Sequence, residues 1–440
     1  MHRRRFVSAL AAAAALSSAG CNIFGEKPKP RLPGDRISVL GLDRKIQPDP
    51  ALANQPITLP AATTNAEWPE PGGNPSHAMG NLALPGQVKK AWETSVGDGT
   101  ARYTKVMAQP VVAAGRVFAM DGGVQVSALD PATGKQFWQV DLTPEGQRGN
   151  GFGGGPCFWN GHLFVATGYG EVISLDPGTG KIIWRKSVTS PVHCAPTVVD
   201  NRIFVVTVDN ELIALSAADG QRQWSHNGIP ETGSLLGSAS PAVEGDIVVV
   251  AYSSGELFAL QVQNGRSLWS ENLAAARSPG TLEGMADIHG RPVIDRGRVF
   301  AVSHSGRMLA IDLRTGGHIW EQELGGTHEP WSAGDFIFVI TNDNELVCLT
   351  RAEGKVRWAV QLPSFEDMEK KKDPIQWVGP VMGGGQLIML SSTGFAMWVS
   401  AQDGSEKSRT SVSDKCYLGP IIAGSTLYLL TDDANLSAYR

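Results

Sequence analysis

The 440-residue chain has few cysteines and little excess charge. Its five cysteines include no adjacent pair and no Cys-x-x-Cys spacing, which argues against a cysteine metal centre. The formal net charge is -5, so a basic surface for nucleic acid is not expected. No Ser-His-Asp arrangement or metal cluster stands out, and the glycine run at 151–155 opens no helix that would bind a phosphate. We therefore expect no catalytic residue, no metal site and no cofactor.

Long apolar runs are also missing, apart from the alanine-rich stretch that begins at residue 6. This stretch is too short to span a bilayer as a stable helix, and it follows three arginines, so residues 1–20 are predicted to be a secretory signal. The signal ends in Ser18-Ala19-Gly20-Cys21, which is similar to a bacterial lipoprotein cleavage site, although Ser18 stands where Leu is usual. We expect Cys21 to carry the lipid anchor. The alternative is an ordinary signal peptide with an incidental Cys21.

Glycine and proline, in contrast, are abundant. The 51 glycines and 27 prolines together favour many short strands joined by turns. Residues 21–66 contain seven of these prolines and little periodic hydrophobicity, so this segment is predicted to be an extended, mostly unpacked tether. Residues 67–440 would then form the folded body.

A repeat of about 44 residues occupies the body. Each unit opens with a proline, seven units have a glycine 24 residues later, and six have a tryptophan four residues after that glycine; the seventh has Ser408 there. The opening prolines are Pro110, Pro156, Pro196, Pro241, Pro292, Pro330, Pro380 and Pro420, and the repeat tryptophans are Trp138, Trp184, Trp224, Trp269, Trp320 and Trp358. Spacing is constant within units and variable between them, as expected for tight hairpins joined by surface links.

Each unit is interpreted as four short strands; in the second unit these cover 156–159, 162–167, 171–175 and 181–185. Such a unit is typical of a β-propeller blade, so the chain is predicted to be an all-β, eight-bladed propeller. Each repeat tryptophan is expected to pack over the glycine turn of a neighbouring blade. The last unit lacks an outer strand, and residues 87–96, with Trp92 in the repeat position, are predicted to supply it and close the ring.

The AxDxxTGxxxW pattern of these units resembles the repeat of the quinoprotein (pyrroloquinoline quinone) alcohol dehydrogenases. That resemblance implies an oxidoreductase holding its quinone against adjacent cysteines and using a carboxylate base beside calcium. The chain has no adjacent cysteines, and its recurring aspartates, such as Asp130, Asp176 and Asp312, lie in predicted turns. A periplasmic quinoprotein, or a degenerate descendant of one, is therefore kept as the alternative function.

A closer resemblance joins the lipoprotein signal, the proline-rich segment and the eight blades. Residues 68–82, 234–237 and 285–320 are similar to the BamB family, lipoproteins of the outer-membrane β-barrel assembly machinery. This resemblance implies a non-enzymatic scaffold on the periplasmic side of the outer membrane, which binds the POTRA domains of the barrel-forming subunit BamA and assists unfolded barrel proteins. Carried over by position, the contact residues would be Leu235, Leu236, Asp287 and His289. The family pattern has Arg where Leu236 stands and Asp where His289 stands.

Three further features leave alternatives open. Cys157, Cys194, Cys348 and Cys416 are expected to be buried thiols, and only Cys157 and Cys194, in adjacent repeats, could form a disulfide bond. Residues 361–377 form a charged insertion, predicted to be helical or mobile. Tryptophans outside the repeat position favour the core, although they could also serve a lipid-anchored propeller that binds polysaccharide; these are Trp159, Trp331, Trp377 and Trp398.

Overall fold

The computed structural model describes residues 46–440, except for residues 54, 148, 150, 232, 234 and 275–285. The predicted signal at 1–20, Cys21 and the first part of the predicted tether therefore lie outside the described residues. Within the described part, the only helix is the short 3-10 helix η1 (Pro50–Leu52), and all other regular structure is strand. No helix in these ranges has the length and apolar character needed to cross a membrane. The prediction of an all-β chain is confirmed.

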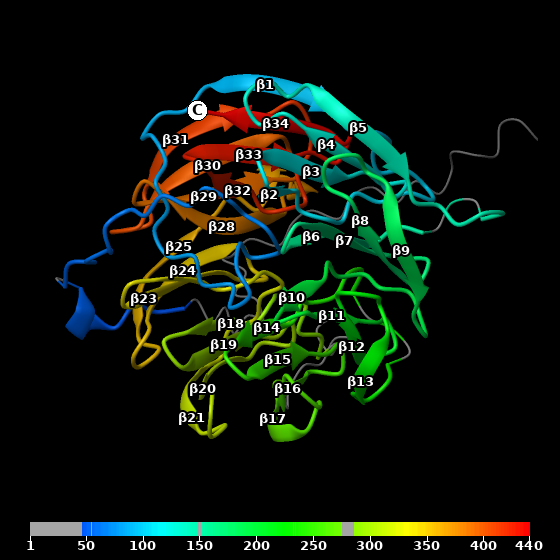
Figure 1. Ribbon diagram of the computed structural model, residues 1–440. Coiled ribbons are helices and arrows are strands. Elements are labelled where there is room, and N and C mark those ends of the chain that lie inside the picture. Colours follow the sequence, from blue (N-terminus) through cyan, green and yellow to red (C-terminus); the bar gives the residue numbers. More distant parts are fainter. Residues whose placement is uncertain are drawn as a thin grey trace, which may run out of the picture. The chain divides into compact units, whose positions relative to one another are not determined.

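Eight four-stranded antiparallel sheets are arranged as blades around a common axis (Figure 1). Blades 1 to 4 consist of β2 (Val111–Ala113), β3 (Arg116–Met120), β4 (Gln125–Leu129) and β5 (Gln136–Asp141); β6 (Gly154–Trp159), β7 (His162–Thr167), β8 (Glu171–Leu175) and β9 (Ile182–Ser187); β10 (Thr197–Val199), β11 (Arg202–Val206), β12 (Glu211–Ser216) and β13 (Arg222–Asn227); and β14 (Ala242–Glu244), β15 (Ile247–Ala251), β16 (Glu256–Gln261) and β17 (Ser267–Asn272).

Blades 5 to 8 consist of β18 (Val293–Asp295), β19 (Arg298–Val302), β20 (Met308–Asp312) and β21 (His318–Gln322); β22 (Trp331–Ala333), β23 (Phe336–Ile340), β24 (Glu345–Thr350) and β25 (Val356–Gln361); β28 (Trp377–Gly383), β29 (Gln386–Ser391), β30 (Phe395–Ser400) and β31 (Glu406–Ser411); and β32 (Ile421–Ala423), β33 (Thr426–Leu430), β34 (Asn435–Tyr439) and β1 (Lys90–Ser95). The predicted eight-bladed propeller is confirmed. The predicted closing strand is also confirmed, because β1 pairs antiparallel with β34 beside the chain's C-terminus (Figure 1).

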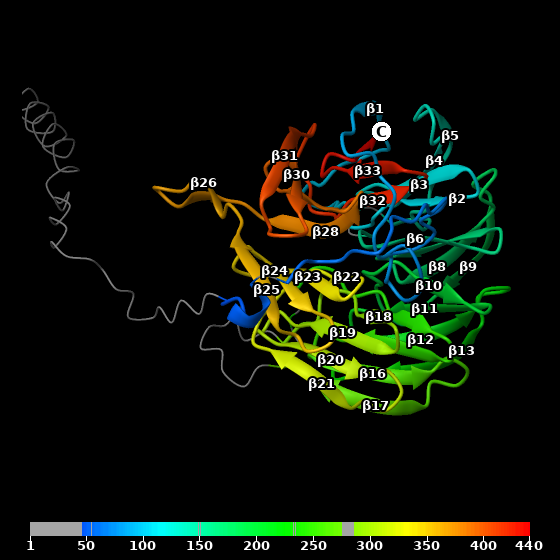
Figure 2. The same ribbon diagram turned by 90° about the vertical axis from the view of Figure 1, so that its left-hand side faces the viewer.

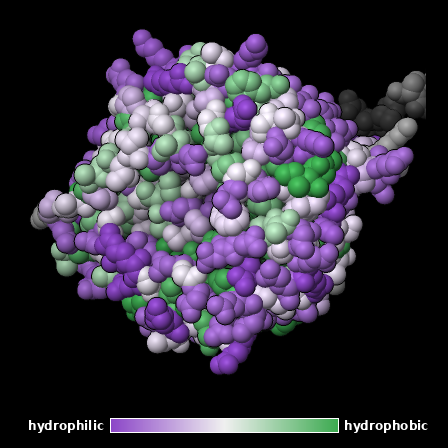
Figure 3. All heavy atoms as spheres, viewed as in Figure 1, coloured by the Kyte–Doolittle hydropathy of each residue, from purple (hydrophilic) through white to green (hydrophobic). Residues whose placement is uncertain are grey.

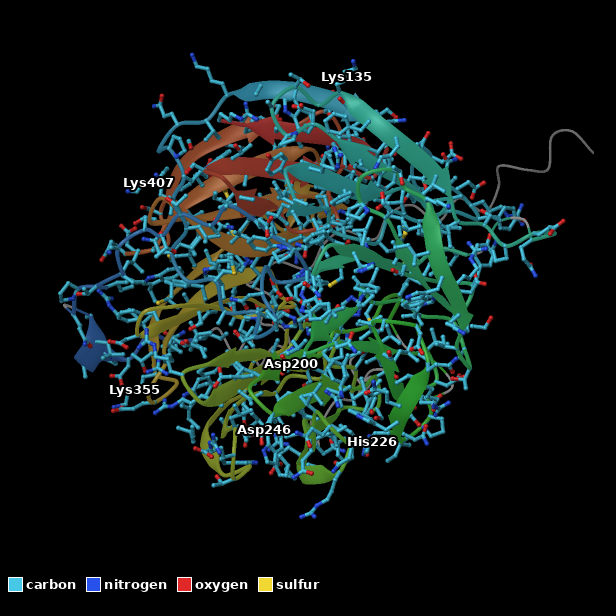
Figure 4. All side chains as sticks on the ribbon, viewed as in Figure 1. Lys135, Asp200, His226, Asp246, Lys355 and Lys407 are labelled. Carbon is cyan, nitrogen blue, oxygen red and sulfur yellow. The ribbon has the colours of Figure 1, made fainter. Side chains whose placement is uncertain are left out.

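The recurring aspartates serve the turns between the third and fourth strands. Asp130 Oδ1 accepts hydrogen bonds from the backbone N–H groups of Ala132 (2.7 Å) and Thr133 (2.9 Å). These bonds favour the ionised carboxylate and hold the pKa of Asp130 below its ordinary value. Gly134 closes the same turn at a φ of 72°, where a side chain would be strained. Figure 4 places Lys135, which follows this turn, at the edge of the propeller, whereas Asp200, in the turn between β10 and β11, lies near its middle.

Seven tryptophans join consecutive blades through these glycine turns. Trp92 of blade 8 lies against Gly134 of blade 1, so closely that a Cβ on the glycine would be 2.5 Å from the indole ring. The same contact runs round the ring for Trp138, Trp184, Trp224, Trp269, Trp320 and Trp358, which lie against Gly180, Gly220, Gly265, Gly316, Gly354 and Gly404. Most of these indoles also donate Nε1–H to a backbone carbonyl of the next blade, as Trp269 does to Leu313 O at 2.7 Å.

We expect Trp269→Ala to lower the free energy of unfolding by about 3 kcal/mol, because it removes a buried indole, its hydrogen bond and the surface on which the Gly316 turn rests. Chemical denaturation followed by intrinsic fluorescence would measure the loss. Leu268→Ala is the matched control on the same strand, since Leu268 is exposed and should cost well under about 1 kcal/mol. Equal losses for the two variants would contradict the blade-docking role.

The exception at Ser408 coincides with the seam of the ring. Blade 8 is assembled from both ends of the body, so no turn joins β34 to β1, and a tryptophan at position 408 would have no glycine turn to pack on. Across the sheet pairing, each repeat tryptophan faces a small residue on the third strand, for example Ala310 opposite Trp320. In blade 7 this pair is inverted: Trp398 stands on the third strand opposite Ser408. Seven junctions between blades therefore have a tryptophan–glycine contact, and the junction between blades 7 and 8 lacks it.

The N-terminal part of the body differs from the predicted tether, which was placed over residues 21–66. Residues 46–66 pack on blades 6 and 7: Asp49 N donates to Val356 O (2.8 Å), and Ile57 exchanges hydrogen bonds with the Gln402 side chain. Ile57 is only 4% exposed. The described chain is thus part of the packed body from residue 46 onward. Proline-rich sequence does not exclude packing, because extended chain can bond to exposed strand edges.

Residues 63–84 close one end of the propeller axis. The inner strand of each blade exposes unpaired backbone groups toward the axis, and this segment bonds to the inner strands of blade after blade. Backbone N–H groups donate to it from Val112 (to Trp68 O), Phe158 (to Pro69 O), Val243 (to Pro75 O), Ile294 (to Ser76 O) and Gly384 (to Leu82 O). In blade 6 the Trp331 indole donates to Gly80 O instead. We call residues 63–84 the axial plug.

The charged insertion between blades 6 and 7 contains two short strands and no helix. It forms a small hairpin of β26 (Phe365–Asp367) and β27 (Lys372–Pro374), which projects from the propeller body in Figure 2. The expectation of a helix was wrong because Lys371 and Asp373 adopt positive φ and turn the chain back on itself. Met368 near its tip is 59% exposed.

Candidate partner-binding face and axial pocket

Two links between blades bring the four predicted contact residues together. The link before β14 holds Leu235 and Leu236, and the link before β18 holds Asp287 and His289. The backbone N–H of Leu235 donates to Asp287 Oδ2 at 2.9 Å, so the side chain of one link is bonded to the backbone of the other. This contact spans 52 residues of sequence. The prediction that the two links are neighbours therefore agrees with the geometry.

The four residues have unequal access to a partner. Leu236 is 50% exposed and Leu235 is partly buried, whereas Asp287 is only 3% exposed. Burial raises the pKa of Asp287 to about 6, and the Leu235 N–H partly offsets that rise. The Asp287 backbone O also accepts from His304 N at 2.9 Å. Asp287 is thus placed to hold the Leu235–Leu236 segment in position, and Leu236 is the residue that faces outward.

His289 lies inside the propeller rather than on its outer face. Its ring packs on Gly237, where a Cβ would be 2.6 Å from Cε1. Burial, the positive charge of Arg291 and His304 lower the pKa of His289 to about 4, so the imidazole is neutral at pH 7. Its Nδ1 is buried and has no hydrogen-bond partner in the described part of the chain.

His289 and Leu236 line a cavity of about 460 Å³ on the propeller axis, with Pro71 of the axial plug among its lining residues. We call it the axial pocket. All eight blades contribute, in most cases through the residue that precedes the opening proline: Gln109, Ala195, Ser240, Arg291, Glu329, Gly379 and Gly419. Sequence reasoning missed this pocket, although the position before each repeat proline is the signal that would have found it.

An ion pair lies in the wall of the axial pocket. Arg291 Nε donates to Glu329 Oε2 at 2.6 Å, and Arg291 Nη2 donates to Gln109 Oε1 at 2.9 Å. The guanidinium holds the pKa of the buried Glu329 carboxyl below its ordinary value, against the effect of burial. Beside the pair, burial lowers the pKa of His328 to about 4.

The described residues form none of the other sites that the sequence left open, namely a metal site, a disulfide bond or a stacking surface of Trp331, Trp377 and Trp398. Among residues 46–440, with the gaps given above, no group of three or more His, Cys, Asp or Glu side chains is arranged to hold a metal ion. Cys157, Cys194, Cys348 and Cys416 are buried free thiols, so no disulfide bond joins Cys157 to Cys194. Trp331, Trp377 and Trp398 are at most 5% exposed and belong to the core. On the face shown in Figure 3, apolar side chains occur in small separate groups among polar ones.

The fold and the repeats place the chain in the class of eight-bladed propellers with quinoprotein-type repeats. Comparison with solved structures reflects this. The fold is similar to BamB from Moraxella catarrhalis (19% identity, TM-score 0.69, covering 80% of this chain and all of that one). It is also similar to a quinohemoprotein alcohol dehydrogenase from Pseudomonas putida (11% identity, TM-score 0.65, covering 87% and 83%). At these identities the likeness shows the fold alone.

Sequence comparison separates the two. Residues 121–360, more than half of the chain, match the family described as "Outer membrane protein assembly factor BamB". Relatives of that description include proteins from Alkalilimnicola ehrlichii (30% identical over 350 residues, 79% of this chain and 87% of the relative) and Yersinia pestis (26% over 356 residues, 80% and 88%). A Vibrio cholerae relative is 36% identical over 254 residues, 58% of this chain and 65% of its own length. The chain belongs to the BamB family of outer membrane protein assembly factors.

Proposed function

We propose that this protein is a non-enzymatic scaffold that binds the POTRA domains of the barrel-forming subunit BamA and assists the insertion of β-barrel proteins. In this proposal residues 1–20 are a signal peptide, Cys21 carries the lipid that anchors the chain to the outer membrane, and the propeller faces the periplasm. Membership of the BamB family supports the assembly role. Residues 21–45 would then be the tether that lets the body reach its partner.

The observation that supports the partner contact is the exposed Leu236, on a link that a hydrogen bond to the neighbouring link holds in place. Leu236 is 50% exposed, and Ile229 in the same link is 56% exposed, so this link offers apolar surface to a partner. The hydrogen bond from Leu235 N to Asp287 Oδ2 limits the freedom that the loop would lose on binding. Leu235 and Leu236 would make the contact, Asp287 would position them, and His289 would contribute from the axial pocket.

We expect Leu236→Asp to release the POTRA-bearing partner, because it places an unpaired charge in the apolar part of the contact. Affinity purification of the full chain from detergent-solubilised outer membrane, with quantification of co-purified partner, would measure the loss. Leu268→Asp is the matched control, since this leucine is 38% exposed and lies near the start of the outer strand β17, whose other end leads into the link before β18. Full recovery of the partner with Leu236→Asp, at unchanged melting temperature, would refute the contact face.

A further inference from the structure

The axial pocket is continuous with the proposed partner face. Leu236 and His289 belong to the two contact links and also line the pocket. Tyr417, on the blade 8 side of the lining, is 40% exposed, so apolar and aromatic side chains stand at the mouth on both sides. A partner that covers the links would therefore cover the mouth of this pocket. At about 460 Å³ the cavity can take one or two side chains but no folded element.

The pocket wall offers hydrogen-bond donors that the protein itself does not use. Of the five N–H donors of Arg291, one bonds to Glu329 and one to Gln109, and no other bond of this guanidinium is found among the described residues. The Arg291 side chain is 21% exposed, which leaves it accessible from the cavity. The buried Nδ1 of His289, another pocket-lining residue, also has no partner within the described ranges, and this nitrogen donates in the tautomer that carries its proton there.

These groups favour a ligand that is negatively charged and accepts hydrogen bonds. A guanidinium presents its donors in a planar fork that matches a carboxylate. The Glu329 carboxylate is already bonded to Arg291. The charges that shift the pKa of His289 are those of Arg291 and His304, and no carboxylate contributes to that shift. Lys105 lines the cavity as well, and Asp432 is the one other acidic residue of the lining.

We infer that the axial pocket receives an Asp or Glu side chain projecting from the protein that binds the link face, with Arg291 as its principal partner. The inference rests on the proposed function, since the same partner would occupy the links and the pocket. It predicts that recognition has two parts: apolar contact at Leu236, and a charge-assisted hydrogen bond on the propeller axis, where all eight blades meet.

A substitution that fills the pocket from blade 8, across the axis from the two contact links, tests the inference without changing a residue of those links. Gly419, just before the first strand of blade 8, has no positive φ, and the nearest atom to a Cβ there would be the end of the flexible Gln109 side chain at 3.3 Å, with Gly379 backbone atoms at an ordinary 3.9 Å. Gly419→Phe would place a ring in the cavity. Gly86→Phe is the matched control, because Gly86 lies outside the pocket lining and has open space around it. The charge is tested by the paired change Arg291→Gln with Glu329→Gln, which removes both charges and leaves neither one buried alone.

The measurement is the dissociation constant of the full chain in detergent for a purified POTRA-domain fragment of the barrel-forming subunit, determined by calorimetry alongside each variant's melting temperature. We expect Gly419→Phe and the Arg291/Glu329 pair each to weaken binding at least tenfold, and Gly86→Phe to leave it unchanged. Binding within twofold of the parent for both pocket variants, with binding abolished by Leu236→Asp, would overturn the pocket while the link face stands. If the unsubstituted chain does not bind the fragment, the proposed function fails, and the pocket proposal fails with it.

Discussion

A chain that ends at Thr431, and so lacks β34, is expected to lose cooperative folding of the whole ring. β34 pairs with β33 on one side and with β1 on the other, so its removal leaves blade 8 as two separated pieces. It also frees Trp92, which holds blade 1 through the Gly134 turn. Differential scanning calorimetry should show no single unfolding transition for this chain.

Deletion of residues 22–45 is the control for the truncation, since it leaves every contact of the described body in place. Its melting temperature should stay within about 2 °C of the parent, because all contacts among the described residues remain and the proposed tether is not part of the ring. Ending the chain after Ala438 gives an intermediate case. That truncation removes the hydrogen bonds between Lys89 and Arg440, at 2.7 and 3.0 Å, and should lower the melting temperature while folding survives. Similar melting temperatures for all three chains would contradict closure of the ring by β1 and β34.

Replacing Glu70 in the axial plug by glutamine is expected to stabilise the protein at alkaline pH. Glu70 is 4% exposed, its Oε2 accepts one hydrogen bond from Val198 N (3.3 Å), and burial raises its pKa from an ordinary 4.5 to about 8. In the unfolded chain this group ionises near 4.5, so between pH 4.5 and 8 the folded state holds more protons. Stability therefore falls as pH rises through this window.

The loss amounts to about 5 kcal/mol at pH 9, which lies above both pKa values, and Glu70→Gln removes it. The amide oxygen can still accept from Val198 N, and no buried charge forms. Urea denaturation of both proteins at pH 7, 8 and 9 would measure the difference, which should widen with pH. Glu67→Gln is the control, because Glu67 lies three residues earlier and is exposed. Parallel pH profiles for the parent and Glu70→Gln would show that Glu70 titrates normally.

The blades could be predicted from the sequence because their determinants are local. A strand of about five residues, a tight turn with Asn or Gly at positive φ, and an aspartate that caps the next turn all lie within one repeat. The strands of blade 2 illustrate this: residues 162–167 and 171–175 were predicted with the bounds that the structure has. The closing strand was also predictable, because a repeat tryptophan at position 92 marked it.

The candidate site was predictable only in part. The neighbourhood of the two links followed from blade connectivity, since both pass from an outer to an inner strand. The division of roles within it did not follow: the sequence could not show that Asp287 is buried against Leu235 N or that Leu236 is the outward residue. Burial depends on what the next blade places over each link, and that is not encoded in the link itself.

By itself, then, the sequence determined the number of blades, their strands and the tryptophan that joins each to the next, because these depend on short, repeated spacings. Only the tertiary structure decided what lies on the axis. The axial pocket is built from residues of all eight blades, whose repeat positions lie roughly forty residues apart, and the axial plug is one continuous segment that bonds to the inner strands of several blades; these parts become neighbours when β1 pairs with β34 and closes the ring. The same closure accounts for Ser408, the one repeat position without a tryptophan, because the seam of the ring has no turn for an indole to cover.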